Sequence, residues 1–461
     1  MSGTATSSGS TVPSARLYQR DFSPQELKAR RDRVIETIGA SAMAIVQGAP
    51  KNSTHDLFRQ SNDFYYLSGV EVPHAYLLMD GRSGRSSLFL PHRSRELAER
   101  EGELLSSDNA QVCRDLVGVD EVLGPESLAQ RLEGATCLYT PFRQGEGLVS
   151  SWDTLQRARQ DAISDPWDEC PDRTSQFLSV LRARCPKAEV RDLAPALDAL
   201  RLVKSPSEIA LLRRAGAAAA RGLIEAMRCT RPGVLEYQLD AALRYHYLAA
   251  GARDVAYRSI VAGGPNAWYG HYNANDCELR DGDLLLLDTG PEVRYYTSDI
   301  TRMWPVNGTY SPVQRQLYGF IVEYHKALLG VIRAGRTEMQ IREEAARVMR
   351  PVVERTRFPK EIYAQAAMRT LDFAHLTHSV GLSVHDVGTY KTGKPIPAGV
   401  VFALDPQLII PEEKLYIRVE DTVAVTETGV ENLTGLAPLE LSEIERLMRE
   451  PGLLQVRPPE V

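Results

Sequence analysis

Five residues in the C-terminal half of the chain offer acid or imidazole side chains beside apolar runs. They are Asp288, Asp299, His378, Asp405 and Glu420. Charged groups in such surroundings are costly to bury unless they are paired or bound to a cation. Four carboxylates therefore cannot share one buried site without positive charge. One histidine with four carboxylates is a hard, oxygen-rich ligand set that suits two divalent ions, with Mn²⁺ favoured and Co²⁺, Zn²⁺ or Fe²⁺ as alternatives.

Two metal ions in such a set would support hydrolysis. Ions about 3.5 Å apart can hold a bridging hydroxide as the nucleophile and polarise a carbonyl. Each residue alone has an ordinary explanation, because Asp288 belongs to a D-T-G turn, Asp299 caps a strand end and Glu420 forms a solvated pair with Asp421. The combination of all five at these spacings favours the metal site over those explanations.

The segments around the first two acids predict a pair of strands. Residues 280–290 (RDGDLLLLDTG) are typical of a turn followed by a buried strand, and residues 292–306 of a second strand that returns from a short turn. Asp288 and Asp299 are therefore expected on adjacent antiparallel strands.

The length of 461 residues predicts two domains, because a single hydrophobic core rarely grows beyond about 250–300 residues. In the first part, apolar runs typical of strands occur at 41–48, 65–70, 75–80 and 86–91. A helical pattern follows at 94–105. We expect a disordered tail over residues 1–14, rich in Ser, Thr and Gly, and an α/β domain over 15–198.

A long helix is expected to open the second domain. Ser205 can cap it, Pro206 fits its first turn and Glu208 completes a capping box. Further helical patterns lie at 235–250, 312–331 and 338–354, and strand-rich stretches follow them. Helices followed by strands predict an α+β domain over 199–461.

Composition and charge exclude several classes of protein. Hydrophobic residues at 43% and charged residues at 25% are typical of a globular protein. A net charge of −6 without blocks of like charge predicts neither a nucleic-acid partner nor a membrane partner. Six cysteines without a CxxC spacing argue against a zinc ribbon or a disulfide scaffold. With no signal-peptide pattern and no apolar run of about 18 residues, we expect the cytoplasm as the location.

Four motifs surround the candidate ligands. They are DTG with Asp288, SDITR with Asp299, THSVGLSVHDVG with His378 and His385, and RVEDTVAVTETGVENLT with Arg418 and Glu420. Over about residues 200–440 this set resembles the metallopeptidase family of aminopeptidase P, prolidase and methionine aminopeptidase, whose catalytic half has the pita-bread fold. The segment FRQSNDFYYLSGVEVPHAYLLMD in the first half is similar to the non-catalytic domain of aminopeptidase P, which favours that branch.

The resemblance implies a role for each ligand. Asp288 would chelate one metal, and Asp299 and Glu420 would bridge both. His378 would complete the other site together with Asp405.

The resemblance also implies roles for three residues that do not bind metal. His271, in the segment YGHYNAN, matches a histidine that contacts substrate near the scissile bond. His385 matches a histidine that hydrogen-bonds the peptide carbonyl and stabilises the developing oxyanion. Arg418 would hold a metal-ligand carboxylate in place.

Two departures from the family pattern stand out. The family usually has Thr-Val-Glu-Pro-Gly over residues 403–407, where this chain has Ala-Leu-Asp-Pro-Gln, so the acid that binds metal and serves as general base is one methylene shorter at Asp405. A displacement of about 1 Å in a catalytic group can lower a rate on the order of a hundredfold. The site is then weakened, retuned to another metal spacing, or rescued by backbone movement. Relatives also carry one more residue between His375 and His378, which leaves the role of His375 open.

The resemblance implies a metal-dependent aminopeptidase that removes the N-terminal residue from peptides with proline second, in a homodimer or homotetramer. A prolidase restricted to Xaa-Pro dipeptides is the nearest alternative. Another is a degenerate member that keeps the fold but acts as a binding or scaffold protein, which Asp405 and Gln407 motivate. A metal-free creatinase-like hydrolase is disfavoured because four of the five ligand types are intact.

Overall fold

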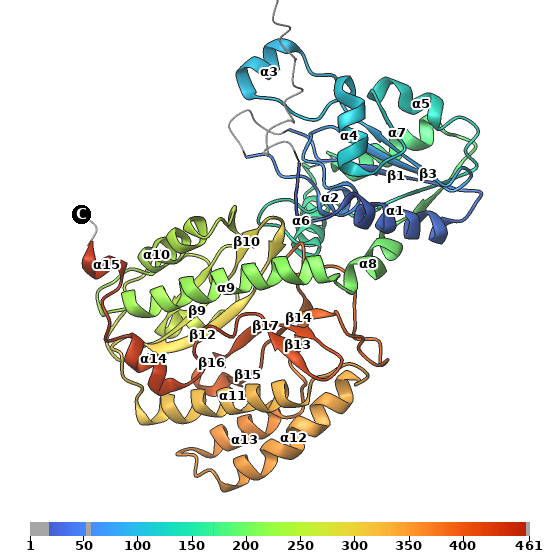
Figure 1. Ribbon diagram of the computed structural model, residues 1–461. Helices are drawn as coiled ribbons and strands as arrows, with labels where there is room; N and C mark the ends of the chain where they lie inside the picture. Colours follow the sequence, from blue (N-terminus) through green and yellow to red (C-terminus); the bar gives the residue numbers. More distant parts are fainter. Residues whose placement is uncertain (1–17, 52–56, 169, 458–461) are drawn as a thin grey trace, which may run out of the picture. The chain divides into compact units, whose positions relative to one another are not determined.

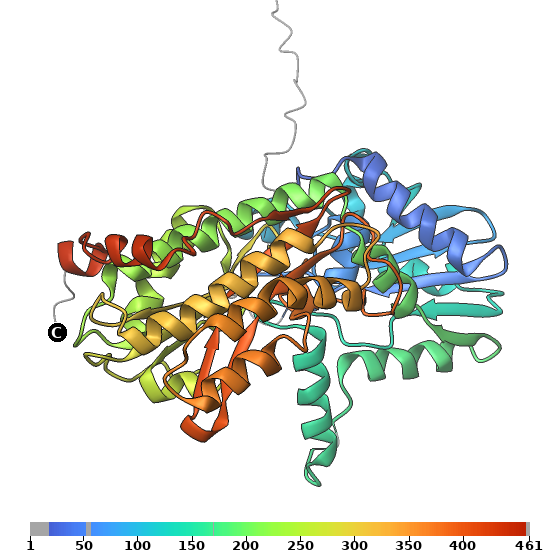
Figure 2. The ribbon, with the colours of Figure 1, turned by 90° about the horizontal axis from the view of Figure 1, so that it is seen from below.

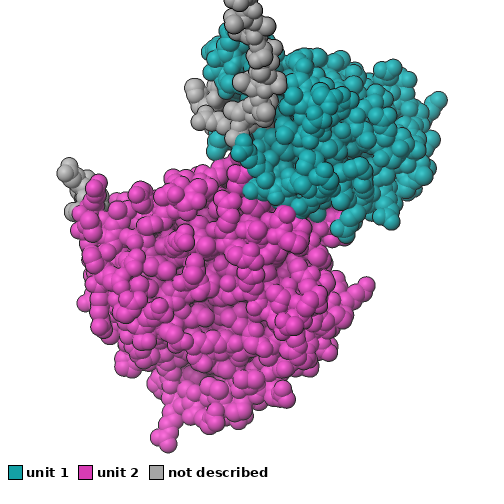
Figure 3. Space-filling view, in the orientation of Figure 1, with its two compact units in different colours: residues 1–147, 155–197 teal, residues 148–154, 198–461 magenta. Residues whose placement is uncertain are grey.

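The computed structural model describes residues 18–51, 57–168 and 170–457. The chain forms two compact units, which Figure 3 distinguishes by colour. The first contains the described residues up to 147 together with 155–197, and the second contains 148–154 and 198–461. Residues 148–154 thus pack with the second unit although they precede the boundary expected near residue 198. The tail expected over 1–14 lies outside the described residues.

The first unit is an α/β layer structure built on a six-stranded sheet in the order β4-β3-β2-β1-β5-β6. The strands are β1 (Met43–Gln47), β2 (Tyr76–Asp80), β3 (Arg85–Phe89), β4 (Glu121–Leu123), β5 (Cys137–Thr140) and β6 (Glu189–Asp192). The helices are α1 (Pro24–Ile38), α2 (Asn62–Ser68), α3 (Arg95–Glu101), α4 (Ala110–Val117), α5 (Leu128–Arg131), α6 (Trp152–Ser164) and α7 (Arg173–Arg184), and the first three residues of α6 belong to the second unit. The strands expected at 41–48, 75–80 and 86–91 and the helix expected at 94–105 are confirmed.

The strand expected at 65–70 is wrong, because these residues belong largely to helix α2. Ser61, in an extended conformation, precedes the helix, and Asp63 lies in its first turn, where an acid is favourable. Gly69 ends it with a φ of 67° and donates its N–H to the carbonyl of Tyr65. A short apolar run does not distinguish a buried helix from a strand, and here the flanking residues determine the outcome.

Helices cover both sides of the strands in the second unit (Figures 1 and 2). In Figure 1, α9 (Pro206–Cys229) and α10 (Glu236–Ala249) lie on one side, and α11 (Pro312–Val331), α12 (Glu338–Arg355) and α13 (Glu361–Thr370) on the other. The smaller helices are α8 (Ala194–Leu202), α14 (Leu441–Leu447) and α15 (Leu453–Val456). The capping box predicted for α9 is present, since Ser205 and Glu208 exchange side-chain to backbone hydrogen bonds. None of the described helices is long and apolar enough to cross a membrane.

The central sheet of the second unit has the order β13-β14-β17-β12-β9-β8, with β18 paired to β17, and all its neighbours are antiparallel. Its strands are β8 (Ile260–Gly263), β9 (Leu284–Thr289), β12 (Ile300–Pro305), β13 (Leu376–Ser379), β14 (Val401–Leu404), β17 (Glu420–Val425) and β18 (Val430–Asn432). A small sheet is formed by β7 (Asp254–Val255), β10 (Pro291–Val293) and β11 (Tyr296–Thr297). A hairpin is formed by β15 (Gln407–Ile410) and β16 (Leu415–Arg418). The expected antiparallel pairing of the strands next to Asp288 and Asp299 is confirmed.

A fully buried charge network ties β12 to β17. The guanidinium of Arg302 donates to Asp421 Oδ1 at 2.9 Å and to the backbone carbonyl of Glu420 at 2.8 Å. Burial alone would raise the pKa of Asp421, but the guanidinium of Arg302 and the hydrogen bond from Thr434 outweigh burial and lower it. The imidazole Nε2 of His325 lies 3.2 Å from Asp421 Oδ2 without hydrogen-bonding geometry. Burial lowers the pKa of His325 to about 4, so this ring is neutral near pH 7.

Gly290 is expected to resist substitution because β9 and β12 approach closely there. A Cβ at this position would lie 1.7 Å from the carbonyl oxygen of Ser298. We expect Gly290→Ala to lower the free energy of unfolding by about 1–3 kcal/mol in urea denaturation. Gly330→Ala is the control, because this α11 position has open space and alanine should raise stability by about 0.5–1 kcal/mol. Equal stability of Gly290→Ala and the unchanged protein would contradict the close approach.

His325 is expected to make the fold sensitive to acid. The unfolded chain takes up a proton on this histidine near pH 6.5, whereas the folded protein does so only near the lowered pKa of about 4. Stability from this residue is therefore complete above pH 6.5 and is lost as pH falls to 4, by ~3 kcal/mol.

The measurement is urea unfolding at pH 7 and pH 4.5. The loss of stability between the two conditions should be smaller in His325→Leu than in the unchanged protein. Leu328→Ala, a buried α11 variant without a titratable group, should be destabilised to a similar extent at both pH values. An unchanged pH dependence in His325→Leu would show that the pKa of this histidine is the same in the folded protein as in the unfolded chain.

Candidate metal centre

The five predicted ligands gather at one edge of the central sheet because neighbouring strands are antiparallel. Asp288 lies near the end of β9, Asp299 directly precedes β12, Glu420 begins β17, Asp405 follows β14 and His378 lies in β13. The register places Thr301 of β12 opposite Asp288 on one side and Glu420 on the other. Leu404, the residue before Asp405, pairs with both Leu376 and Asp421. The end of one strand thus meets the start of the next at a common edge.

Three of the ligand side chains already converge. Asp299, His378 and Glu420 each offer an atom within 4.8 Å of the others. His378 Nε2 lies 3.4 Å from Asp299 Oδ2 and 4.0 Å from Glu420 Oε1, while its Nδ1 is 3.3 Å from the carbonyl oxygen of Ser379. Glu420 Oε1 is buried and has no hydrogen-bond partner among the described residues. A buried carboxylate oxygen in this state is costly unless a cation takes it, so this group fits a metal ion.

Arg418 joins the other two acids to this group. Its Nη1 is 3.2 Å from Asp288 Oδ2, its Nε is 3.0 Å from Asp405 Oδ1, and its Nη2 forms an ion pair with Glu420 Oε2. Burial alone would lower the pKa of Arg418, but Asp405 and Glu420 outweigh burial and raise it. Its position agrees with the supporting role that the resemblance implies.

Negative charge exceeds positive charge in this cluster. Burial raises the pKa of Asp299, and repulsion from Glu420 and Asp288 raises it further. Burial also raises the pKa of Asp288, Glu420 and Asp405, despite the nearby guanidinium of Arg418. One guanidinium cannot balance four carboxylates. Divalent cations would supply the missing positive charge, and the hard donor set suits them.

Two kinds of hydroxyl group also contact the ligands, and the sequence analysis did not identify them. The Tyr257 hydroxyl is 2.5 Å from Oδ1 of both Asp288 and Asp299, and burial followed by these two charges raises its pKa. Thr301 Oγ1 donates to Glu420 Oε2 at 2.9 Å, and Thr422 Oγ1 accepts from the backbone N–H of Asp299 at 2.9 Å. The threonines follow Asp299 and Glu420 by two residues, a same-face spacing in a strand that could have indicated them. Tyr257 lies outside the four motifs and carried no such signal.

His385 lies beside His378 and is held by residues far away in the sequence. The two imidazole centroids are 4.0 Å apart. His385 Nδ1 is 2.6 Å from Asp153 Oδ2, and its backbone N–H donates to Ser151 Oγ at 3.3 Å. Burial alone would raise the pKa of Asp153, but His385 outweighs burial and lowers it. Asp153 is thus a further residue of the site, and its separation of 232 positions from His385 hid it from motif analysis.

His271 lies apart from the ligands. His271 is in an exposed turn, and no hydrogen bond or ion pair joins it to the cluster within the described ranges. Its loop is anchored by the buried Glu236, which accepts from Gly263 N–H and Tyr272 Oη. The substrate contact expected of His271 stays a prediction.

His375 supports the backbone next to the site. It has a φ of 53°, and its Nε2 is 2.9 Å from the carbonyl oxygen of Thr370. Its own carbonyl accepts the N–H of Asp405 at 2.9 Å. Burial lowers the pKa of its imidazole to about 4. His375 therefore fixes the main chain that carries Asp405.

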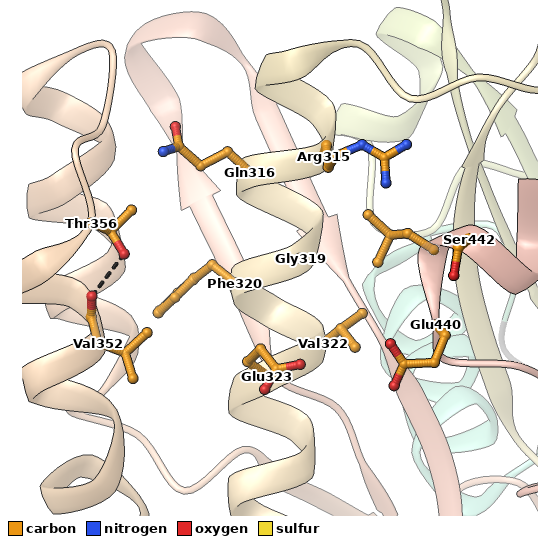
Figure 4. Close-up of a pocket in the computed structure, with 11 residues that line it drawn as sticks. Arg315, Gln316, Gly319, Phe320, Val322, Glu323, Val352, Thr356, Glu440 and Ser442 are labelled. Carbon is orange, nitrogen blue, oxygen red and sulfur yellow. Dashed lines mark hydrogen bonds between the residues drawn. The ribbon is translucent and has the colours of Figure 1, made fainter.

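A cavity of about 410 Å³ lies elsewhere on the second unit, between α11, α12 and residues 440–442 (Figure 4). None of the predicted ligands lines it. Its charged side chains are paired within the chain, since Arg315 contacts Glu445, and Lys326 contacts both Glu323 and Glu440. The carboxylate cluster is the better candidate for chemistry.

Comparisons with known proteins cover almost the whole chain. The model of metallopeptidase family M24 matches residues 210–427, and that of the aminopeptidase P N-terminal domain matches residues 27–137. Xaa-Pro aminopeptidase of Escherichia coli K12 is 32% identical over 93% of this chain and 98% of that protein.

Two solved structures extend the likeness to the fold. Proline aminopeptidase P II from Yersinia pestis is 31% identical, with a TM-score of 0.75 over 93% of this chain and 100% of that one. Aminopeptidase P from E. coli with the inhibitor Pro-Leu is 30% identical, with a TM-score of 0.73 over 93% and 99%. These likenesses confirm the expected α/β N-terminal domain followed by a pita-bread catalytic domain. The chain belongs to metallopeptidase family M24 and has the two-domain organisation of aminopeptidase P.

Proposed function

We propose that this protein is a metal-dependent aminopeptidase that hydrolyses the bond between an N-terminal residue and a following proline. The observation that carries the proposal is the gathering of four buried carboxylates, His378 and Arg418 at one sheet edge. It occurs in a chain that aligns over nearly its full length with an Xaa-Pro aminopeptidase. The tertiary amide of an Xaa-Pro bond calls for a dedicated site with strong carbonyl polarisation.

The ligands proposed for two divalent ions are those expected from the sequence. Asp288 would hold one ion, His378 and Asp405 would hold the other, and Asp299 and Glu420 would be ligands shared by both. When bound, such ions activate water and polarise the scissile carbonyl, and Mn²⁺ is the proposed metal.

The proposed tasks of the protein groups follow from their contacts. Arg418 restrains the carboxylates of Asp288, Asp405 and Glu420 and so fixes the directions of their lone pairs. Asp405 is the proposed general base. His385 gives its Nδ1 proton to the hydrogen bond with Asp153, and in the imidazolium its Nε2–H is the donor that a developing oxyanion needs.

Location in the cytoplasm and assembly into a homodimer or homotetramer stay predictions.

Release of the first residue from Xaa-Pro-Yaa tripeptides tests the proposed function. Full-length protein loaded with Mn²⁺ should cleave these tripeptides, and removal of the metal by a chelator should abolish the activity until Mn²⁺ is restored. Asp299→Asn should be inactive with the same peptides, and a tripeptide with Ala at the second position is the substrate control. Turnover of Xaa-Pro dipeptides alone would assign a prolidase. Failure to bind any divalent ion after Mn²⁺ loading would end the metallopeptidase interpretation.

Loss of the Asp153 carboxylate should impair the turnover step more than substrate binding. We expect Asp153→Asn to lower kcat by about 10- to 100-fold with a smaller change in KM, below the 10²–10³ typical of losing an oxyanion donor itself. Asp161→Asn, at an exposed position of the same helix α6, is the matched control and should be unaffected. An unchanged kcat in Asp153→Asn would remove His385 from the proposed oxyanion role or Asp153 from its support.

A further inference from the structure

The short acid Asp405 is held by two donors from one hairpin. Gln407 Nε2 donates to Asp405 Oδ2 at 2.5 Å, and Arg418 Nε donates to Asp405 Oδ1 at 3.0 Å. Gln407 and Arg418 are direct cross-strand partners in the pairing of β15 with β16. Residues in such a pair have side chains about 5 Å apart on the same face. The hairpin therefore presents one donor to each oxygen of the carboxylate.

This arrangement fixes the orientation of a group that would otherwise rotate. The carboxylate torsion of aspartate has broad minima, so the side chain alone does not define where its oxygens point. A carboxylate offers about four lone-pair positions, and the two donors take one on each oxygen. The remaining positions stay available to a cation. The backbone is fixed as well, because the N–H of Asp405 donates to His375 and its side chain is buried.

Gln407, like Asp405, is one of the four positions of residues 403–407 that depart from the family pattern. Relatives usually have glutamate and glycine where this chain has Asp405 and Gln407. A glutamate at 405 would carry its carboxylate about one C–C bond, roughly 1.5 Å, farther out. It would crowd the amide of Gln407, because Gln407 Nε2 already lies 2.5 Å from Asp405 Oδ2. A glycine at 407 would offer no amide to the shorter acid. The two departures are therefore fitted to each other.

We propose that Gln407 is a positioning residue that orients the shortened Asp405 carboxylate for metal binding, so that Asp405 and Gln407 together replace the glutamate and glycine of relatives. The inference rests on the metal centre of the proposed function. It differs from the weakened or degenerate site that Asp405 alone suggests. The Asp405 side chain is one methylene shorter than glutamate, but the fixed orientation of its carboxylate offsets the lost length.

Titration of the metal-stripped full-length protein with Mn²⁺ by calorimetry tests the role of the amide. Gln407→Met keeps the length of the side chain and removes the donor. We expect the affinity for Mn²⁺ to fall by about 10- to 100-fold, the usual effect of losing a group that orients a ligand. Gln365→Met, at an exposed position of α13, is the control for the same replacement and should bind Mn²⁺ as the unchanged protein does.

A double-mutant cycle tests the mutual fit. Asp405→Glu and Gln407→Gly should each weaken Mn²⁺ binding, the first by crowding the amide and the second by releasing the carboxylate. Asp405→Glu with Gln407→Gly should restore the affinity to within about threefold of the unchanged protein, a coupling that additive sites do not show. Urea unfolding of each metal-free variant separates loss of the hairpin from loss of the ligand.

The outcomes distinguish this inference from the proposed function. Unchanged or tighter Mn²⁺ binding by Gln407→Met, or additive effects in the cycle, would overturn the positioning role alone, and tighter binding would mean that the amide obstructs the ion. Absence of Mn²⁺ binding by the unchanged chain would overturn the proposed function too. Because binding is measured without peptide, a lack of Xaa-Pro turnover would leave the inference intact while rejecting the proposed substrate.

Discussion

Repulsion among four buried carboxylates is the constraint on which this structure depends. Carboxylates brought together away from water favour their protonated forms unless positive charge is placed among them. The fold provides part of that charge through Arg418, whose three nitrogens reach Asp288, Asp405 and Glu420. It leaves the remainder for cations, and the unpartnered Glu420 Oε1 marks where one is needed. Arg418 thus balances part of the negative charge at the sheet edge, and the remaining negative charge requires bound cations.

Alternation along β17 separates two charge problems that lie one residue apart. Successive side chains of a strand point to opposite faces, so Glu420 enters the ligand cluster while Asp421 enters the core on the other side. There Arg302 and Thr434 bind Asp421, and His325 stays neutral. The second acid is therefore balanced within the protein, and only the first depends on a cation. This division keeps the strand stable next to a site that carries excess negative charge.

The sequence predicted those features whose determinants are local. The capping box of α9 and the pairing of β9 with β12 follow from neighbouring residues, and the ligand motifs lie at strand ends that topology brings together. Residues 65–70 were misread because their apolar run suits a strand and a helix equally. Asp153 could not be found, since only the folded chain brings it to His385. Tyr257 escaped for the same reason, as its contacts with Asp288 and Asp299 depend on strand packing.

The chain leaves the first unit at residue 148, and residues 148–154 belong to the second unit. It then re-enters the first unit at residue 155. A gene fragment that begins at residue 198 would therefore encode all the proposed metal ligands but omit the partner of His385. The second unit is therefore not formed by one uninterrupted stretch of the chain. The second unit is instead assembled from two separate stretches of the chain, residues 148–154 and the stretch that begins at residue 198.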